Sequence, residues 1–266
     1  YVRHHLARRN LMPTPDGISL SGVYKTFEGR GKTVEALHDV TLHCPPASFT
    51  AVIGPSGCGK STALRVALGL ETADAGEVLI NGEAPIKAAK SGKTGIAFQD
   101  SALLPWRSVR RNVEVPLEVI GLSRKAHATR VQAMIDLVGL NGFENSLPSE
   151  LSGGMRQRVA IARALVTEPS VLFMDEPFGA LDQILRRQMN VELQRVWQET
   201  GSTALLVTHG IDEAIFLADR VAVMHANPGR IVEIIDVPFA RPRHPDLFSD
   251  PGFHALTDRI ASVLHG

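Results

Sequence analysis

The chain is poor in cysteine, in aromatic residues and in net charge. Its 266 residues include only two cysteines, Cys44 and Cys58, which are too few for a disulfide framework. Lys+Arg and Asp+Glu both number 28, and this balance argues against binding nucleic acid through bulk electrostatics and against a disordered acidic tail protein. No apolar run exceeds five residues, whereas a membrane-spanning helix needs about 20. We therefore expect no membrane span.

Both ends of the chain differ in composition from the middle. Residues 1–17 are basic, contain Pro13 and Pro15, and lack the apolar stretch of a signal peptide, so we expect a poorly ordered lead-in to a cytosolic protein. The absence of an initiator methionine suggests a longer gene product. The tail from Pro238 is proline-rich and then carries an amphipathic helical pattern near 255–264.

Between these ends, short apolar strands alternate with helical patterns. Residues 100–167 contain no convincing strand, and helical spacing dominates there, for example over 124–138. A further helix is predicted over 212–218. Apolar strands that alternate with helices predict a parallel sheet covered on both faces, with a helical insert and a mixed β region near the start. The predicted strands are 18–24, 34–42, 49–53, 76–81, 95–98, 171–174, 204–208, 220–224 and 231–235.

A phosphate-binding loop is indicated at 54–62, where G-x-x-x-x-G-K-[ST] lies between an apolar strand and a helix at 61–70. Its glycines let the backbone turn tightly and point N–H groups inward, and the helix N-terminus adds partial positive charge. Lys60 would reach the β- and γ-phosphates, and the Ser61 hydroxyl would ligate Mg²⁺. The motif predicts a nucleotide but fits kinases, GTPases, helicases and transport ATPases alike. The residues expected to line the site are Gly54, Pro55, Ser56, Gly57, Cys58, Gly59, Lys60, Ser61 and Thr62.

Two acids follow the apolar strand 171–174. A buried strand delivers such residues to the carboxyl edge of the sheet, beside the phosphate loop. Asp175 is expected to hold Mg²⁺ through water. Glu176 is the candidate general base or water-orienting group.

A second anion site is indicated at 151–158, at the start of a helix that runs to about Val166. Ser152, Gly153 and Gly154 offer a hydroxyl, bare backbone amides and a helix N-terminus. A capped helix start is the plain alternative. Because the chain has two such sites but one phosphate-loop lysine, an economical arrangement is a head-to-tail dimer. The second site of one chain would then close on the nucleotide held by the other.

In this order the motifs resemble the ATP-binding cassette (ABC) family over about residues 18–235. The matches are Walker A at 54–62, Walker B at 171–176 and the signature motif at 151–157, the family's most specific mark. The resemblance implies an α/β fold, with a P-loop NTPase (RecA-like) core, an N-terminal antiparallel β subdomain and an inserted α-helical signature subdomain. It places the ATPase domain at 18–237, the helical subdomain at about 100–167 and a tail at 238–266.

The resemblance also implies roles for individual residues, with ATP and Mg²⁺ as cofactors. Tyr24 looks like the aromatic that stacks on adenine, and Gln99 like the glutamine that senses Mg²⁺ and the γ-phosphate. His209 looks like the switch histidine, which hydrogen-bonds the γ-phosphate and holds Glu176. The implied catalytic set is Lys60, Gln99, Glu176 and His209, and the metal set is Ser61, Gln99 and Asp175. Nucleotide contacts beyond the phosphate loop are Tyr24, Ser152, Gly153, Gly154, Gln157 and, in the loop that crosses the dimer interface, Asp182.

Within this family the sequence favours an energy-coupling subunit of a bacterial importer. A chromosome-maintenance ATPase needs long coiled coils between its Walker motifs, and only 115 residues separate Lys60 from Asp175. A translation-type ATPase needs a second cassette. The implied partners are a second copy of the chain, separate permease subunits and, indirectly, a solute-binding protein, at the cytoplasmic face of the inner membrane. The segment after Gln99 resembles nitrate, sulfonate and taurine importer subunits; another transporter class or a non-transport ATPase is the alternative.

Two local expectations remain open at this stage. Leu103, Leu104 and Trp106, rimmed by arginines at 107, 110 and 111, form either a docking surface for a permease helix or a plug in the core. Cys58 lies at a helix N-terminus beside Lys60, which predicts a lowered thiol pKa and a reactive residue, with an inert filler as the alternative.

Overall fold

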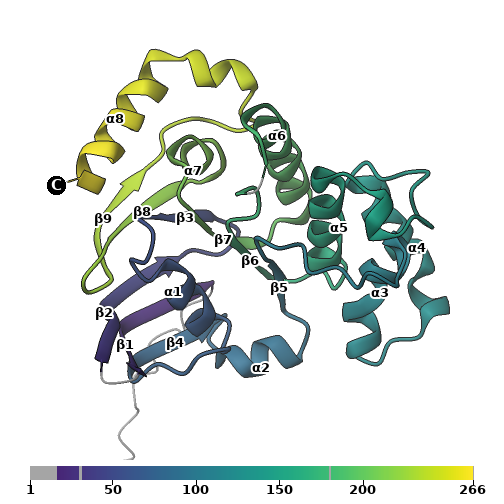
Figure 1. The fold of residues 1–266 in the computed structure, drawn as a ribbon, viewed down its shortest axis with the longest axis horizontal. Coiled ribbons are helices and arrows are strands. Elements are labelled where there is room, and N and C mark those ends of the chain that lie inside the picture. Colours follow the sequence, from purple (N-terminus) through teal and green to yellow (C-terminus); the bar gives the residue numbers. More distant parts are fainter. Residues whose placement is uncertain (1–16, 30–31, 180, 266) are drawn as a thin grey trace, which may run out of the picture.

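Two β-sheets organise the molecule (Figure 1). The computed structural model describes residues 17–29, 32–179 and 181–265. The smaller sheet is antiparallel in the order β2-β1-β4, and the larger has the order β5-β6-β7-β3-β8-β9. The smaller sheet consists of β1 (Ile18–Gly29), β2 (Lys32–Cys44) and β4 (Ala75–Ile80). The larger consists of β3 (Phe49–Ile53), β5 (Thr94–Ala97), β6 (Val171–Asp175), β7 (Thr203–Thr208), β8 (Arg220–His225) and β9 (Arg230–Asp236).

The larger sheet is parallel, as predicted, except at the edge formed by β9. β9 runs antiparallel to β8. Only four residues, 226–229, connect the two strands, and a parallel pair needs a crossover of a dozen or more. Asn81 and Gly82 form a tight turn after β4, in which both residues have positive φ, 48° and 73°.

Helices cover both faces of the larger sheet. They are α1 (Lys60–Ala67), α2 (Pro85–Lys90), α3 (Val109–Val119), α4 (Arg124–Leu137), α5 (Gly153–Leu165), α6 (Gln183–Thr200), α7 (Ile211–Leu217) and α8 (Pro251–His265). The interval 100–167 contains helices and no strand, as expected. The sequence analysis missed α2 and α6. The ends of α6 carry recognisable signals, since Asp182 caps its N-terminus and Gly201 ends it in the left-handed conformation.

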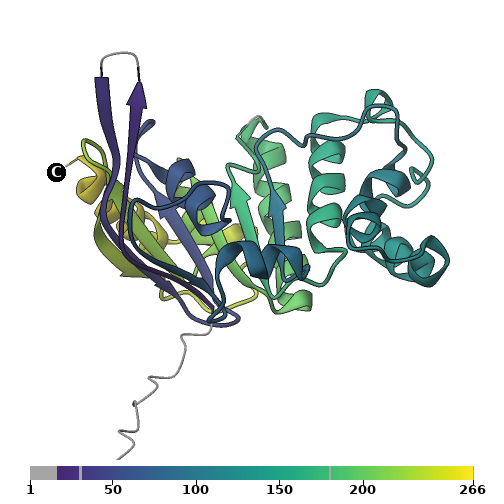
Figure 2. The same ribbon diagram turned by 90° about the horizontal axis from the view of Figure 1, so that it is seen from below.

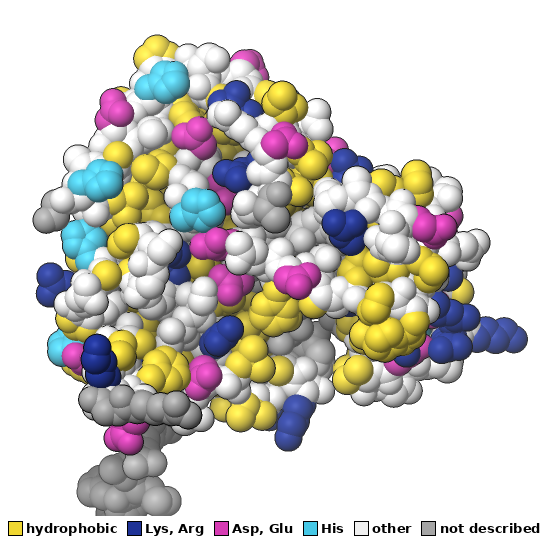
Figure 3. Space-filling view, viewed as in Figure 1, with side chains coloured by type: hydrophobic (Ala, Val, Ile, Leu, Met, Phe, Trp, Pro, Cys, Tyr) yellow, Lys and Arg dark blue, Asp and Glu magenta, His cyan; other side chains and the backbone are white. Residues whose placement is uncertain are grey.

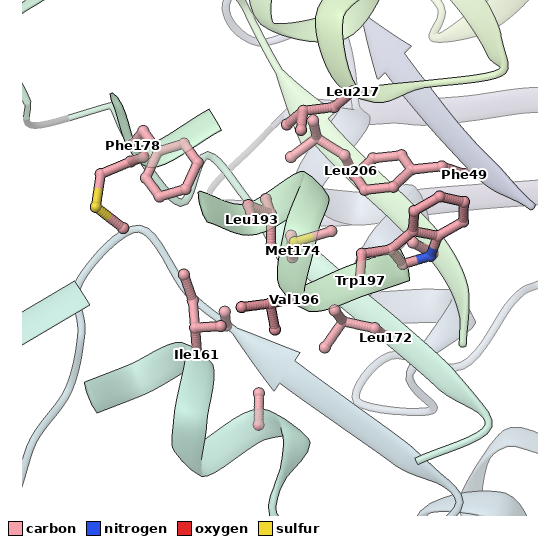
Figure 4. Close-up of a cluster of buried hydrophobic side chains, with 14 of the residues drawn as sticks. Phe49, Ile161, Leu172, Met174, Phe178, Leu193, Val196, Trp197, Leu206 and Leu217 are labelled. Carbon is pink, nitrogen blue, oxygen red and sulfur yellow. The ribbon is translucent and has the colours of Figure 1, made fainter. Parts of the chain in front are cut away.

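The strand alternation divides the core into two layers. On β3, Phe49, Ala51 and Ile53 belong to the cluster packed against α5, α6, α7 and α8, whereas Val52 belongs to the cluster shared with α1 and the smaller sheet. Figure 4 shows the first layer, where Phe49 meets the edge of Trp197 on α6 with ring centroids 5.4 Å apart. This two-sided burial holds the carboxyl ends of β3, β6 and β7 in fixed positions beside the phosphate loop.

The helical insert forms a lobe to one side of the larger sheet, with α3 and α4 beyond α5 (Figure 2). At the opposite side, β1 and β2 project beyond the other labelled helices and strands. The lobe presents a patch of hydrophobic side chains with Lys and Arg at its far edge (Figure 3). Within the described residues, every helix is too short or too polar to cross a membrane.

Candidate active site

The phosphate loop connects β3 to α1 and adopts a conformation that requires glycine. Gly57 and Gly59 have φ of 79° and 99°, in the left-handed region that L-residues avoid. A Cβ on Gly54 would lie 2.4 Å from the carbonyl oxygen of Met224. The Lys60 ammonium crosses the loop and donates to the carbonyls of Gly54 at 2.8 Å and Pro55 at 3.0 Å. The loop therefore holds a buried cation where the motif predicts one.

The two predicted acids lie next to this loop, as their strand predicts. The Ser61 hydroxyl donates to Asp175 Oδ1 at 3.1 Å. Burial, with a contribution from the neighbouring Glu176, raises the pKa of Asp175, while Ser61 and Lys60 oppose the shift. The positive charges nearby only partly balance the carboxylate of Asp175, and the hydroxyl oxygen of Ser61 lies beside it. Hard oxygen ligands of this kind suit Mg²⁺.

Glu176 and His209 meet at the same edge of the sheet. His209 Nδ1 lies 3.2 Å from Glu176 Oε2. The backbone N–H of Glu176 also donates to the carbonyl of Val207 in β7 at 2.8 Å. Two contacts therefore join the segment of Glu176 to the segment of His209. Glu176 has a φ of 45°, an unusual value for a residue other than glycine, asparagine or aspartate. This conformation follows directly after β6 and accompanies the contact of the carboxylate with the histidine.

A cavity of about 390 Å³ opens over the phosphate loop. Its wall combines the loop with Glu176 and with residues of the β1–β2 hairpin and of the turn between β8 and β9. The lining residues are Phe27, Val34, Glu35, Ala36, Ser56, Gly57, Gly59, Lys60, Ser61, Thr62, Glu176, Asn227 and Gly229. A nucleotide with its phosphates on the loop would direct its base toward Phe27 and Val34.

Tyr24 does not line this cavity, which corrects the expectation that it contacts the base. Its ring packs edge-on against His38, with centroids 5.0 Å apart. Phe27, three residues later, lies on the cavity wall with 38% of its surface exposed, opposite Val34 on β2. Register shifts in β1 between Val23 and Thr26 decide which aromatic faces the loop, and a bulge of that kind is not visible in the sequence.

A second cavity, of about 440 Å³, separates the helical lobe from the sheet. Gln99 and Gly153 line it together, and neither lines the cavity over the phosphate loop. Ser152 caps α5, since its hydroxyl accepts from the N–H of Met155 at 3.2 Å. Gly154 packs against Leu185, where a Cβ would lie 3.1 Å from the nearest methyl carbon. The two predicted anion sites of one chain are thus separate.

These observations accord with the comparisons with known proteins. The model of the ABC transporter family matches residues 37–179. The chain belongs to this family. It is 43% identical over 226 residues to an uncharacterized ABC transporter ATP-binding protein of Methanocaldococcus jannaschii, covering 85% of this chain and 84% of that protein. It is 42% identical over 235 residues to the aliphatic sulfonates import ATP-binding protein SsuB of Bacillus cereus, covering 88% and 92% respectively.

Solved structures agree with this assignment. A dimeric bacterial ABC transporter cassette, MJ0796, superposes with a TM-score of 0.74 at 31% identity, over 84% of this chain and all of the other. A post-hydrolysis state of that cassette, bound to ADP and phosphate, gives 0.73 at 30% identity, over the same shares of the two chains. The fold is the P-loop NTPase fold expected from the sequence, and members of the ABC transporter family are ATPases.

The structure gives contacts for three more residues of this ABC ATPase that the sequence singled out. Gln157 is 4% exposed, and its side-chain amide donates to the carbonyl of Phe98 at 3.1 Å, so it braces the segment before Gln99 and lines the second cavity with Gln99 and Gly153. Burial raises the pKa of Cys58 more than Lys60 lowers it, so the thiol is not activated. Asp182 accepts from the N–H of Leu185 at 2.9 Å and acts here as the cap of α6.

The sequence analysis also missed Asn227 and Gly229, which close the cavity from the β8–β9 turn. Gly229 packs between loop backbones, because a Cβ there would lie 2.3 Å from the carbonyl oxygen of Cys58. The Asn-Pro-Gly run at 227–229 signals a turn, but nothing local indicates that the turn reaches a phosphate loop 170 residues earlier.

Proposed function

We propose that this chain is the ATP-hydrolysing, energy-coupling subunit of an importer for aliphatic sulfonates or a similar small anionic solute. The observation that supports an intact hydrolytic site is the meeting of three motifs at one sheet edge. Lys60 and Ser61 come from the phosphate loop, Asp175 ends β6 and Glu176 follows it, and His209 follows β7. The solute class rests on the SsuB protein, which is 42% identical to this chain over 88% of this chain's length.

Each residue has a defined part in the proposed hydrolysis. The loop amides and Lys60 bind the β- and γ-phosphates, and Phe27 supports the base. Ser61 and Asp175 would hold Mg²⁺, which when bound neutralises charge on the phosphates. Glu176 orients the attacking water and accepts its proton, while His209 holds Glu176 in place and reaches the γ-phosphate. Catalysis then consists mainly of positioning and charge stabilisation.

A head-to-tail dimer would complete the site. Gly153 lines a cavity apart from the phosphate loop, so a second copy is needed to bring the Ser152–Gly154 turn onto the nucleotide. Ile184, beside the loop of Asp182, is 74% exposed and would be covered in that arrangement. The dimeric form of the related cassette supports self-association.

Permease subunits would dock on the helical lobe. Trp106 is 74% exposed, which excludes its role as a core plug. Val119 at the end of α3 is 79% exposed, and an apolar cavity of about 360 Å³ lies between α3, α5 and β5. The expected basic rim is largely neutralised, since Arg107 pairs with Glu118 at 2.6 Å and Arg111 with Glu114 at 2.7 Å. Apolar contact is therefore the main attraction that this surface offers.

The substitution Glu176→Gln tests the hydrolytic part of the proposal. The variant should bind ATP normally but hydrolyse it at least ~10²-fold more slowly, because it loses the general base. Dimers should then accumulate with ATP in size-exclusion chromatography. Glu77→Gln, an exposed acid on β4, is the matched control. Unchanged turnover in Glu176→Gln would remove this residue from the mechanism.

The solute class needs a separate measurement on the whole transporter. The complex, purified through a tag on this chain and reconstituted in liposomes with internal ATP, should accumulate a labelled alkanesulfonate supplied with its binding protein. Accumulation of a sugar or amino acid in place of the sulfonate would contradict the proposed solute while leaving the ATPase assignment intact.

A further inference from the structure

A buried acid lies directly behind the histidine loop and has no part in the mechanism above. Glu213 is in the first turn of α7, which Figure 1 shows on the larger sheet between α6 and α8. Its side chain is 5% exposed. Carboxylates are seldom buried this deeply unless they are hydrogen-bonded or paired with charge, so the contacts of Glu213 indicate its purpose.

One carboxylate oxygen of Glu213 holds the histidine loop. The Thr208 hydroxyl donates to Glu213 Oε2, and the same hydroxyl accepts from the N–H of Gly210 at 3.0 Å. Thr208 is itself 2% exposed and ends β7, opposite Ile53 at the start of the phosphate loop. The residues on both sides of His209 are therefore joined through the Thr208 hydroxyl, and the acid holds that hydroxyl in place.

The second carboxylate oxygen of Glu213 influences the loop that follows Glu176 only through charge. Glu213 Oε1 is buried and has no hydrogen-bond partner among the described residues. The Arg186 charge stabilises the ionised acid, and Glu176 destabilises it. Arg186 donates to the carbonyls of Phe178 at 3.3 Å and Leu181 at 2.9 Å, which lie in the loop that follows Glu176.

We propose that Glu213 is a positioning residue for ATP hydrolysis, which holds His209 against Glu176 by fixing Thr208 and Gly210. The inference rests on the proposed role of His209 and deepens it. Glu213 touches neither the nucleotide cavity nor its lining residues in the phosphate loop, so its effect on turnover passes through the histidine loop. A misplacement of about 1 Å in a catalytic group can cost ~10²-fold in rate, and that is the scale available to such a residue.

The test compares variants at both ends of the Thr208–Glu213 hydrogen bond. Glu213→Ala and Thr208→Val should each lower kcat at least ~10-fold, with ATP affinity unchanged, because the phosphate loop is intact. Thr208→Ser and Glu213→Gln, which keep the hydroxyl donor and an oxygen acceptor, should retain most of the turnover. Asp212→Ala, an exposed acid in the same helical turn, is the matched control and should behave as wild type.

A double-mutant cycle with His209→Ala separates positioning from a general effect on folding. If Glu213 acts through the histidine, Glu213→Ala should reduce kcat little further in the His209→Ala background. An equal reduction in both backgrounds, or full turnover in Thr208→Val, would overturn the inference. Wild-type turnover in His209→Ala would instead refute the proposed role of the histidine. Melting temperature and ATP affinity verify that each variant is folded, and Thr208→Val is the decisive variant if Glu213→Ala does not fold.

Discussion

Arg243, in the tail, should be among the largest single contributors to the stability of this chain outside the apolar core. Arg243 is only 3% exposed. Its guanidinium donates to the carbonyls of Ile215 at 2.7 Å, Phe216 at 3.0 Å and Ala218 at 2.8 Å. It donates also to the carbonyl of Phe239 at 2.9 Å. The last carbonyls of a helix have no partner within the helix, so this guanidinium caps α7 from a distant segment.

The expected cost of Arg243→Met follows from these contacts. Each buried acceptor left unsatisfied costs about 1–3 kcal/mol. The loss is partly offset, because a buried guanidinium is itself expensive to desolvate, and the same burial lowers the pKa of Arg243 to about 10. We expect a net loss of about 2–4 kcal/mol in the free energy of unfolding.

Urea unfolding followed by circular dichroism measures this loss. The midpoint of Arg243→Met should fall by on the order of 1 M. Arg259→Met on α8, where the side chain is 58% exposed and pairs with Glu233 at 2.7 Å, is the control and should lose less than about 1 kcal/mol. A loss in Arg243→Met no larger than that of the control would refute the reasoning that the tail caps α7.

The remaining predictions concern the nucleotide cavity, the helical lobe and two buried titratable groups. Phe27→Ala should weaken ATP binding several-fold in a fluorescent-nucleotide titration, whereas Tyr24→Ala should not; the opposite order would restore the original assignment. Trp106→Ala should leave the melting temperature of the isolated chain nearly unchanged and abolish stimulation by the permease, and a large drop in melting temperature would contradict docking. Cys58, 1% exposed with a raised pKa, should alkylate slowly in the native chain at pH 7, and rapid labelling detected by mass spectrometry would contradict its burial. Burial raises the pKa of Glu213 to about 7, so the acid keeps its proton to higher pH in the native chain than in the unfolded chain. As the pH rises from about 4.5 to 7, the wild type should therefore lose stability relative to Glu213→Gln. Parallel pH profiles of the two proteins would contradict this.

The sequence alone determined the class of the protein and the chemistry of its site. The phosphate loop, the acids after the apolar strand and the histidine after the next one are local patterns, and each depends on a strand that ends at the same sheet edge. Ser61 therefore meets Asp175, and Glu176 meets His209, as the motifs predict. The boundaries of β3 and the strandless interval at 100–167 follow equally from local hydrophobic patterns.

Only the tertiary structure decided which side chains face the site from distant segments. Phe27 replaces Tyr24 because bulges in β1 change the face that each residue presents, and bulges depend on pairing with β2 and β4. The pKa of Cys58 is raised because surrounding segments bury the thiol, although its neighbours in sequence predicted a lowered pKa. Arg243 caps the end of α7 from a segment 25 to 28 residues further along the chain, a contact that no local pattern specifies. Such contacts depend on how elements pack, and packing joins residues whose separation in sequence carries no signal.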